Sequence, residues 1–318
     1  MAASTLALFA IGCSTQSTAS PEPTTTIAPT RTSTSTPVPT ATPRPDPLTL
    51  SNITPGLSYL QLQLQQAVDS FAQQRGGNFA VAVTDLQTGQ TVSVNGDSVR
   101  LPGCTMNFFV LLQVAKDLQA GQYPESEVGA QIAQTVWASD AAMAHKLLRK
   151  SGGDNSIGGL WKVNTLLHDE LQLSSAIFDH PPANETATLV PGEWQDNAIT
   201  PLDFNRALTM LYRGELLNTE WTMYLINKMS RVKPGLNHLI PSGVSDPTAY
   251  TAHKNGYIDY KPYIVDNDIG IVAFQRGDEH YAYALTFWSQ DNPWVLSDAP
   301  LGHTVSKLVW DYFNAVYT

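Results

Sequence analysis

Cysteine is almost absent from this chain of 318 residues, which contains only Cys13 and Cys104. Two cysteines cannot supply a disulfide framework, and Cys104 has no clear partner histidine for a thiol nucleophile. Long apolar runs are also missing: no stretch reaches the roughly 18 apolar residues that a membrane-spanning helix needs. The sequence has neither His and Cys residues at zinc-binding spacing nor a glycine-rich phosphate loop, so we expect no metal and no cofactor.

Positive charge is scarce as well. The chain has 18 Lys and Arg against 28 Asp and Glu, a formal net charge of −10, and no basic cluster. This balance argues against a nucleic acid or an anionic membrane surface as partner. An anionic substrate would need a local positive site.

The amino-terminal end has the composition of a tether. Residues 6–14, LALFAIGCS, resemble a bacterial lipoprotein signal (residues 1–13), in which Cys13 would carry the lipid. Residues 14–47 are almost wholly Thr, Ser and Pro, too polar to offset the entropy of ordering. At about 3 Å per residue this segment would reach on the order of 100 Å. We therefore expect a domain over residues 48–318 outside the cytoplasmic membrane, lipid-anchored to its outer face or secreted.

The first part of that domain has clear local patterns. Residues 57–75 space their apolar side chains as an amphipathic helix does, and the pattern stops at Gly76-Gly77. Residues 78–96 alternate as two strands joined by a turn at Thr88-Gly89. A further helix begins near Thr105.

The rest of the domain is mostly helical over residues 125–235 and returns to strands at its end. Strands are expected at 250–258, 268–277 and 281–290, and a last amphipathic helix at 301–317. Strands near both chain ends with helices between them predict an α+β fold. It would have one antiparallel sheet built from both ends, flanking helices and an inserted all-helical lobe.

Three short motifs follow one another along this domain. TMNF (105–108) comes after Pro102 at a helix start, SDA (139–141) precedes a helix, and KNG (254–256) lies on a strand. Together with the order of elements, they resemble the class A β-lactamases and the related penicillin-binding DD-peptidases, serine hydrolases with Ser-x-x-Lys, Ser-Asp-Asn and Lys-Thr-Gly motifs. The resemblance covers nearly all of the domain and implies a β-lactamase/transpeptidase-like fold.

The first motif departs most from the family. The resemblance places Thr105 at the nucleophile and Phe108 at the lysine. A hydroxyl at a helix start lies near backbone N–H groups that suit an oxyanion. Phenylalanine, however, cannot supply general-base help, which is worth roughly 10²–10⁴ in rate. The alternative is that Thr105 is a helix N-cap and Phe108 is core packing.

In the second motif, the resemblance implies that Ser139 relays a proton to the leaving nitrogen. Asp140 matches the family, but Ala141 cannot hydrogen-bond a substrate amide. A Ser-Asp pair before a helix is also common capping chemistry, and this alternative stays open.

The third motif is the best preserved. Lys254 would attract a substrate carboxylate, Asn255 would donate a hydrogen bond in place of a hydroxyl, and Gly256 would let a ligand lie against the strand. His253 precedes them and is a further substrate-binding candidate. The alternative is an edge-strand lysine in water.

A long loop, residues 178–197, resembles the family loop that carries the glutamate of deacylation. Glu185 stands closest to the expected place, counted back from Pro201, and His180 in the same loop could titrate near neutral pH. A literal Ser-x-x-Lys at Ser230–Lys233 is rejected, because Pro234-Gly235 would end any helix behind it.

Three functions remain open. The first is a lipoprotein whose β-lactamase-like domain is catalytically impaired or inactive and binds a cell-wall component, such as a peptidoglycan peptide or a β-lactam-like ligand, through Lys254. The second is a slow acyl hydrolase in which Thr105 is the nucleophile and Ser139, Lys254 or Glu185 transfers protons. The third is an interaction or spacer protein whose cleft is closed by Phe108.

Overall fold

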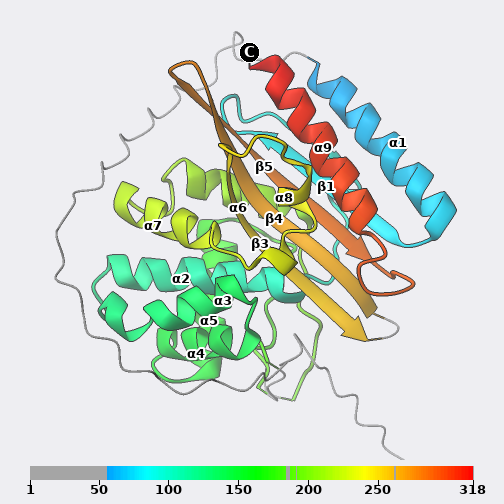
Figure 1. Ribbon diagram of the computed structural model, residues 1–318. Helices are drawn as coiled ribbons and strands as arrows, with labels where there is room; N and C mark the ends of the chain where they lie inside the picture. Colours follow the sequence, from blue (N-terminus) through cyan, green and yellow to red (C-terminus); the bar gives the residue numbers. More distant parts are fainter. Residues whose placement is uncertain (1–55, 184–186, 191, 261–262, 318) are drawn as a thin grey trace, which may run out of the picture.

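The structure, a computed structural model, describes residues 56–183, 187–190, 192–260 and 263–317. A five-stranded sheet lies between a pair of helices on one face and a helical lobe on the other (Figure 1). Cys13, the Thr/Ser/Pro-rich residues 14–47 and Glu185 lie outside the described residues. The predictions made for them stay predictions.

The sheet is antiparallel throughout and has the order β2-β1-β5-β4-β3. Strands β3, β4 and β5 come from the carboxyl end and β1 and β2 from the amino end, so the predicted sheet built from both chain ends is confirmed. The strands are β1 (Asn78–Asp85), β2 (Thr91–Val94), β3 (Tyr250–Tyr260), β4 (Tyr263–Arg276) and β5 (Glu279–Gln290).

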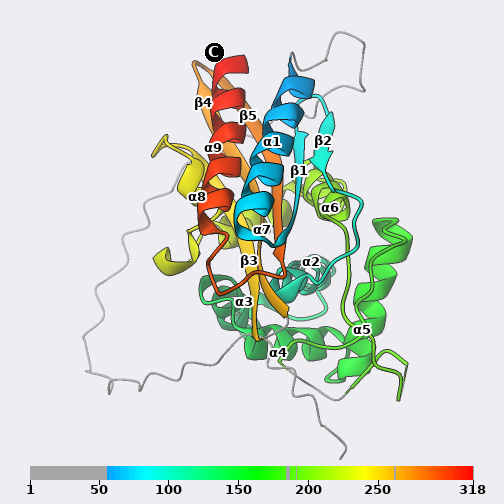
Figure 2. The ribbon, with the colours of Figure 1, turned by 90° about the vertical axis from the view of Figure 1, so that its right-hand side faces the viewer.

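One face of the sheet is covered by α1 (Leu57–Arg75) and α9 (Ala299–Val316), which lie side by side across it (Figure 2). The short α8 (Ile240–Gly243) packs beside α9. The apolar stripe of α1 meets that of α9 over the strands, and the Phe313 ring stacks on Tyr283 with centroids 4.8 Å apart. Burying one such side chain stabilises the fold by roughly 1.5–3 kcal/mol.

The other face carries the predicted helical lobe. Its helices are α2 (Asn107–Gln119), α3 (Gly129–Trp137), α4 (Ala141–Ser151), α5 (Ser156–Thr165), α6 (Pro201–Tyr212) and α7 (Thr219–Met229). Short helical turns precede, connect or follow them: η1 (Gly103–Met106), η2 (Glu125–Glu127), η3 (Leu166–Glu170) and η4 (Pro234–Leu236). A continuous apolar core of α2, α6 and their neighbours rests on the sheet.

Local chemistry fixes where two of the lobe's helices begin. Asp140 caps α4, its carboxylate accepting a hydrogen bond from the Met143 N–H. Thr200 caps α6 in a capping box with Asp203, and Pro201 occupies the first helical position. Of the two helices, α6 packs on the sheet, whereas α4 packs on α2, α3 and α5 and begins two residues after Ser139.

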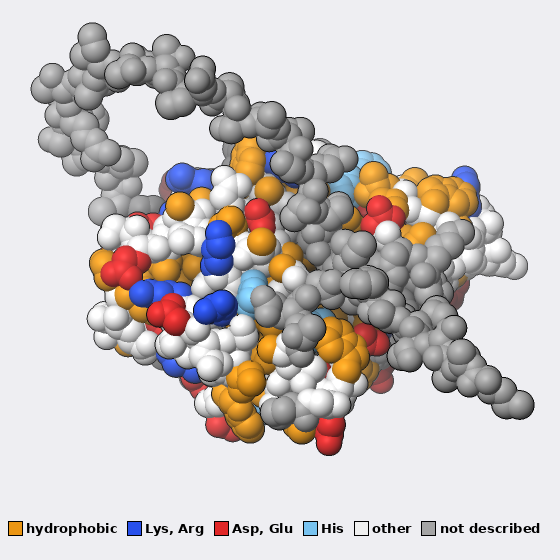
Figure 3. Space-filling view, turned by 90° about the horizontal axis from the view of Figure 1, so that it is seen from below, with side chains coloured by type: hydrophobic (Ala, Val, Ile, Leu, Met, Phe, Trp, Pro, Cys, Tyr) orange, Lys and Arg blue, Asp and Glu red, His pale blue; other side chains and the backbone are white. Residues whose placement is uncertain are grey.

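No helix among the described residues combines the length and apolarity that crossing a membrane requires. From below, Figure 3 shows basic and acidic side chains interspersed over the helical lobe. The visible part of that face therefore offers no continuous basic surface.

Candidate functional site

Thr105 lies inside the η1 turn, one residue before the last residue of that turn. Its hydroxyl donates to the Pro102 carbonyl at 2.6 Å, and the residue has no exposed surface. The residue before η1 is Pro102 and the residue before α2 is Met106, so the interpretation of Thr105 as a helix N-cap is wrong. The cause is the 3-10 turn, which starts the helical path two residues before Thr105.

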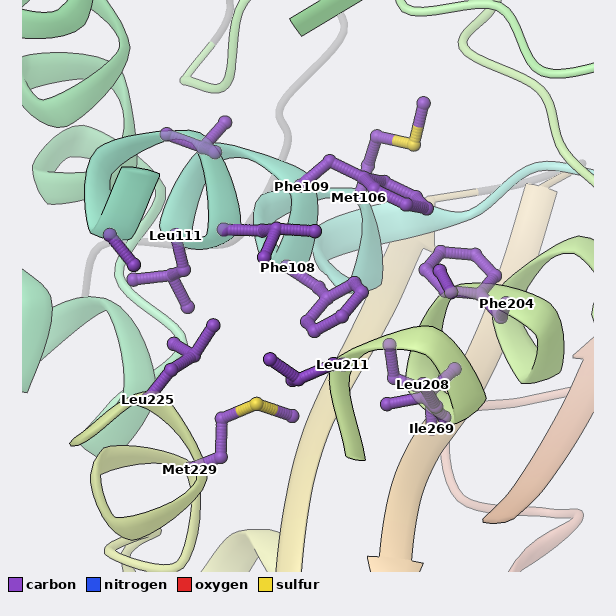
Figure 4. Close-up of a cluster of buried hydrophobic side chains, with 14 of the residues drawn as sticks. Met106, Phe108, Phe109, Leu111, Phe204, Leu208, Leu211, Leu225, Met229 and Ile269 are labelled. Atoms are coloured by element: carbon purple, nitrogen blue, oxygen red, sulfur yellow. The ribbon is translucent and has the colours of Figure 1, made fainter. Parts of the chain in front are cut away.

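Phe108 packs in the hydrophobic core, as the alternative interpretation of the first motif predicted for this residue. Its ring is fully buried and contacts Phe109 edge-on, with centroids 5.2 Å apart, and Phe204 of α6 at 6.4 Å. Figure 4 shows Phe108 reaching from α2 toward Leu211 of α6, among apolar side chains of α2, α6 and α7. The position where the family holds a basic amine is therefore dry and apolar.

Ser139 occupies a left-handed conformation, with φ of 55°, immediately before α4. It is buried, donates from Oγ to the Asn255 carbonyl at 3.1 Å, and accepts a hydrogen bond from Lys254 Nζ. The capping role belongs to its neighbour Asp140. Ala141, at the start of α4, lines a cavity described below.

Lys254 is completely buried, although β3 is an edge strand. Its ammonium donates to Ser139 Oγ and to the Asn255 carbonyl. Burial lowers the pKa of Lys254 to about 7, and the nearby Asp268 carboxylate offsets part of this desolvation. The alternative of an edge-strand lysine in water is therefore wrong, because the side chain turns inward to the helical lobe.

The neighbours of Lys254 are also enclosed. His253 points to the other face of the strand, where Nδ1 lies 2.9 Å from the Asp268 carboxylate and Nε2 lies 3.1 Å from Asn237 Oδ1. Asn255 is fully buried, and neither polar atom of its amide has a hydrogen-bond partner among the described residues.

Gly256 marks where β3 presses against η1. A Cβ at this position would lie 2.2 Å from the Thr105 nitrogen and 2.6 Å from the Cys104 nitrogen. Only glycine allows two backbones to approach so closely. At Gly256 the η1 backbone therefore lies directly against the strand.

The predicted residues of three chain-distant motifs are thus brought together. Ser139 and Lys254 are hydrogen-bonded to each other, and Gly256, two residues after Lys254, lies against the backbone of Thr105. The side chains of Thr105, Ser139 and Lys254 are 0 %, 2 % and 0 % exposed. They meet in a closed interior and not in an open groove, and their catalytic and substrate-binding roles stay predictions.

A cavity of about 100 Å³ lies next to this closed region. Its walls come from η1 and the start of α2, from residues 178–183 and 194–197 of the long loop, and from the end of β3. The His180 ring stacks on Trp194 with centroids 4.2 Å apart, and burial lowers the pKa of His180. Thr105, Ser139 and Lys254 do not line this cavity.

The sequence patterns missed a buried acidic cluster on the far side of β4. His238 Nε2 lies 2.8 Å from a carboxylate oxygen of Asp266. Asp298 lies close enough to Asp266 for the charge of one carboxyl group to shift the pKa of the other. Burial and the Asp266 charge raise the pKa of Asp298 to about 7. Two aspartates two positions apart in a strand rich in apolar residues (Asp266 and Asp268) were the available signal.

The described part of the chain contains no group of three His, Cys, Asp or Glu side chains arranged to hold a metal ion. Cys104 is buried, and the described residues include no free cysteine. Ser230 closes the end of α7 and donates to the Asn227 carbonyl, with no helix running on behind it.

The fold is that of the serine β-lactamases and penicillin-binding proteins. A mutant of PBP-A in an acyl-enzyme complex with penicillin G has 22 % identity and a TM-score of 0.65, over 81 % of this chain and 97 % of that one. The chromosome-encoded β-lactamase of Vibrio parahaemolyticus has 17 % identity and a TM-score of 0.64, over 79 % of this chain and 98 % of that one. A β-lactamase from Xanthomonas campestris has 16 % identity and a TM-score of 0.65, over 80 % of this chain and 98 % of that one.

The sequence itself carries the family signature. Residues 130–313 match the family model described as the beta-lactamase enzyme family. The chain belongs to that family, which confirms the resemblance found in its motifs. No curated protein sequence matches the chain.

Proposed function

We propose that this chain is a β-lactamase-family protein that does not form acyl-enzymes at a useful rate and acts as a binding or structural module at the cell wall. The observation that carries the proposal is the state of Thr105. Its side chain is fully buried, its hydroxyl is engaged by Pro102, and Phe108 replaces the base.

Access is the first supporting argument. Acyl transfer needs the reacting carbonyl about 3–3.5 Å from the nucleophilic oxygen. Thr105 has no exposed surface, and the β3 backbone lies so close to η1 that a Cβ on Gly256 would be 2.2 Å from the Thr105 nitrogen. A substrate would therefore reach the Thr105 hydroxyl only after neighbouring groups had moved.

Proton transfer is the second supporting argument. The side chain one helical turn after Thr105 is the Phe108 ring, which can neither accept a proton nor hold a charge. General-base help contributes roughly 10²–10⁴ in rate, and groups that act as a unit lose their effect together. A buried alcohol without a base is a poor nucleophile.

Place and ligand complete the proposal. The lipoprotein-like signal ending at Cys13 and the Thr/Ser/Pro-rich segment after it support a lipid-anchored domain outside the cytoplasmic membrane. A related structure, the PBP-A mutant, holds penicillin G as an acyl-enzyme, which supports a β-lactam-like or peptidoglycan-peptide ligand. Binding through the Lys254 charge is not part of the proposal, because Lys254 has no exposed surface.

A second candidate function, slow acyl hydrolysis with Thr105 as nucleophile, is favoured by one observation. The pKa of Lys254 is lowered by burial to about 7, so near neutral pH about half of its side chains are neutral amines. Hydrogen-bonded to Ser139, such an amine is a group that could accept a proton.

Mass spectrometry of the intact domain separates the two candidates. We expect no mass increase after prolonged incubation with penicillin G, and no hydrolysis of a chromogenic cephalosporin above the rate of the Thr105→Ala variant. A serine β-lactamase serves as positive control. An adduct on the wild-type chain that disappears in Thr105→Ala would replace the proposal by the second candidate.

The anchor is tested separately in a bacterial host. We expect the full chain to incorporate labelled fatty acid and to fractionate with membranes, and Cys13→Ala to lose both. Equal membrane association of the two chains would refute the lipid anchor and leave the first experiment unaffected.

A further inference from the structure

We propose that Asp266 and Asp298 form a buried proton-binding site, and that loss of its proton opens the corner between β5 and α9. This corner comprises residues 291–298 and lies at the end of the sheet where β4 begins (Figure 1). The site contains none of the residues on which the proposed function rests. The inference therefore goes beyond that function and does not depend on it.

Asp266, Asp268 and Asp298 lie on the side of the sheet that α8 and α9 cover. Alternation along β4 puts the first two on the same side as Val272, which packs in the core beneath α9. Asp298 is the residue directly before α9. All three are at most 1 % exposed. A carboxyl group in such a position needs a paired cation or must keep its proton, because burial removes the water that would solvate its charge.

Two of the three carboxyl groups have a partner that can carry positive charge. Asp268 lies 2.9 Å from His253 Nδ1 and also accepts a hydrogen bond from the Ile240 N–H at 3.1 Å. Asp266 lies 2.8 Å from His238 Nε2. Burial lowers the pKa of His238, but the hydrogen bond and charge of Asp266 outweigh it, so the pKa of His238 is raised. A protonated His238 can therefore balance the charge of Asp266.

Asp298 is the carboxyl group left without a partner. No described residue makes a well-aligned hydrogen bond to either of its oxygens, and Asp266 Oδ1 is unpaired as well. Burial and the Asp266 charge raise the pKa of Asp298 to about 7, and Ser289 and His238 offset only part of this shift. Among the described residues, the other charge that acts on Asp266 is that of Asp268. A second negative charge here has no second cation to balance it.

The corner is the part of the site that can move. The Asn292 N–H donates to the Ile264 carbonyl at 3.2 Å, and the Ala299 N–H donates to the Leu296 carbonyl at 3.2 Å. Trp294 is 56 % exposed. Segments with exposed side chains and few apolar contacts open at low free energy. Opening the corner would bring the carboxylate of Asp298 to water while much of the corner's apolar surface is already outside the core.

The direction and size of the response follow from the two pKa values of Asp298. In an open corner the pKa is the ordinary value of about 4, whereas in the closed corner it is about 7. Below pH 4 both forms hold the proton. Between pH 4 and pH 7 only the closed form holds it, so each pH unit favours opening about tenfold. Above pH 7 both forms have lost it, and the effect levels off.

Hydrogen–deuterium exchange of the full chain at pH 5, 6, 7 and 8, read by peptide mass spectrometry, measures this opening. After correction for the intrinsic effect of pH, exchange of residues 292–302 relative to α1 should rise about 50- to 100-fold from pH 5 to pH 8. Asp298→Asn keeps the shape of the side chain and cannot ionise, so it should remove the rise. Asp291→Asn, the same change at an exposed position of the corner, should keep it.

Asp266→Asn distinguishes a shared site from burial alone and serves as second variant if Asp298→Asn folds poorly. Without the Asp266 charge, Asp298 should ionise at lower pH in the closed corner, and the rise should shrink at least about threefold, which corresponds to half a pKa unit. A wild-type rise below threefold, a full rise in Asp298→Asn, or an unchanged rise in Asp266→Asn would each overturn the proposal. None of these outcomes bears on acylation of Thr105, so the two proposals fail separately.

Discussion

Replacing Lys254 by methionine should change how the stability of this protein depends on pH. An unfolded lysine has a pKa of about 10.4, whereas burial lowers the folded value to about 7. Below pH 7 the amine is protonated in both states, and the folded state carries the whole cost of the buried charge. Between pH 7 and pH 10 the folded state has lost the proton that the unfolded state still holds, so the stability of the wild-type chain rises with pH.

The size of the effect follows from that shift. A difference of about 3.4 pKa units corresponds to about 4–5 kcal/mol between pH 6 and pH 10.5. Methionine has a similar length and no charge, and it loses the hydrogen bonds to Ser139 and to the Asn255 carbonyl, about 1 kcal/mol each. Lys254→Met should therefore be about 2–3 kcal/mol more stable than wild type at pH 6 and about 2 kcal/mol less stable near pH 10.

Urea unfolding followed by tryptophan fluorescence at pH 6, 7, 8, 9 and 10 measures this crossover. Subtracting the free energy of unfolding of one chain from that of the other removes the contribution of groups that titrate alike in both. Lys146→Met, on the exposed side of α4, is the matched control and should give a difference that does not vary with pH. If the wild-type and Lys254→Met curves run parallel across the range, the buried amine is not neutralised and the reasoning is wrong.

Three further changes test the packing around the closed site by chemical denaturation. Phe108→Ala should cost about 3–5 kcal/mol, because a fully buried ring is lost from the α2–α6 contact; a cost below 1 kcal/mol would contradict its core role. Gly256→Ala should cost at least about 1–3 kcal/mol, since its Cβ would meet the Thr105 nitrogen at 2.2 Å, while Gly235→Ala, with open space around it, should be nearly neutral. Asp140→Ala should cost about 0.5–2 kcal/mol by removing the cap of α4, and Asp140→Asn should retain most of that stability.

Much of the fold could be predicted because its signals are local. The apolar spacing of residues 57–75 appears as α1, and the alternation after it appears as β1 and β2, with Gly89 in the turn at a φ of 77°. The order of elements then placed the strands of both chain ends in one sheet. Each of these features depends on neighbours within a few residues or on chain order.

The state of the site depends on contacts across more than a hundred residues, which no local pattern contains. The short motifs predicted that Ser139 and Lys254 belong together, and they touch. The sequence did not indicate that η1 would begin before Thr105 or that β3 would press against it at Gly256. A lysine on an edge strand is usually solvated, and only the packing of the lobe shows that Lys254 is enclosed.

The contacts of the Ser139–Lys254 pair explain how a hydrolase motif can be useful without hydrolysis. Ser139 adopts a left-handed turn just before α4, and both its hydroxyl and the Lys254 amine donate to the Asn255 carbonyl. These bonds join the helical lobe to the edge strand of the sheet. They satisfy polar atoms that would otherwise be unpaired in the interior. The pair therefore has a structural reason to be present in this chain, and the presence of a Ser-Asp or Lys-x-Gly motif in a member of this fold is not by itself a sign of catalysis.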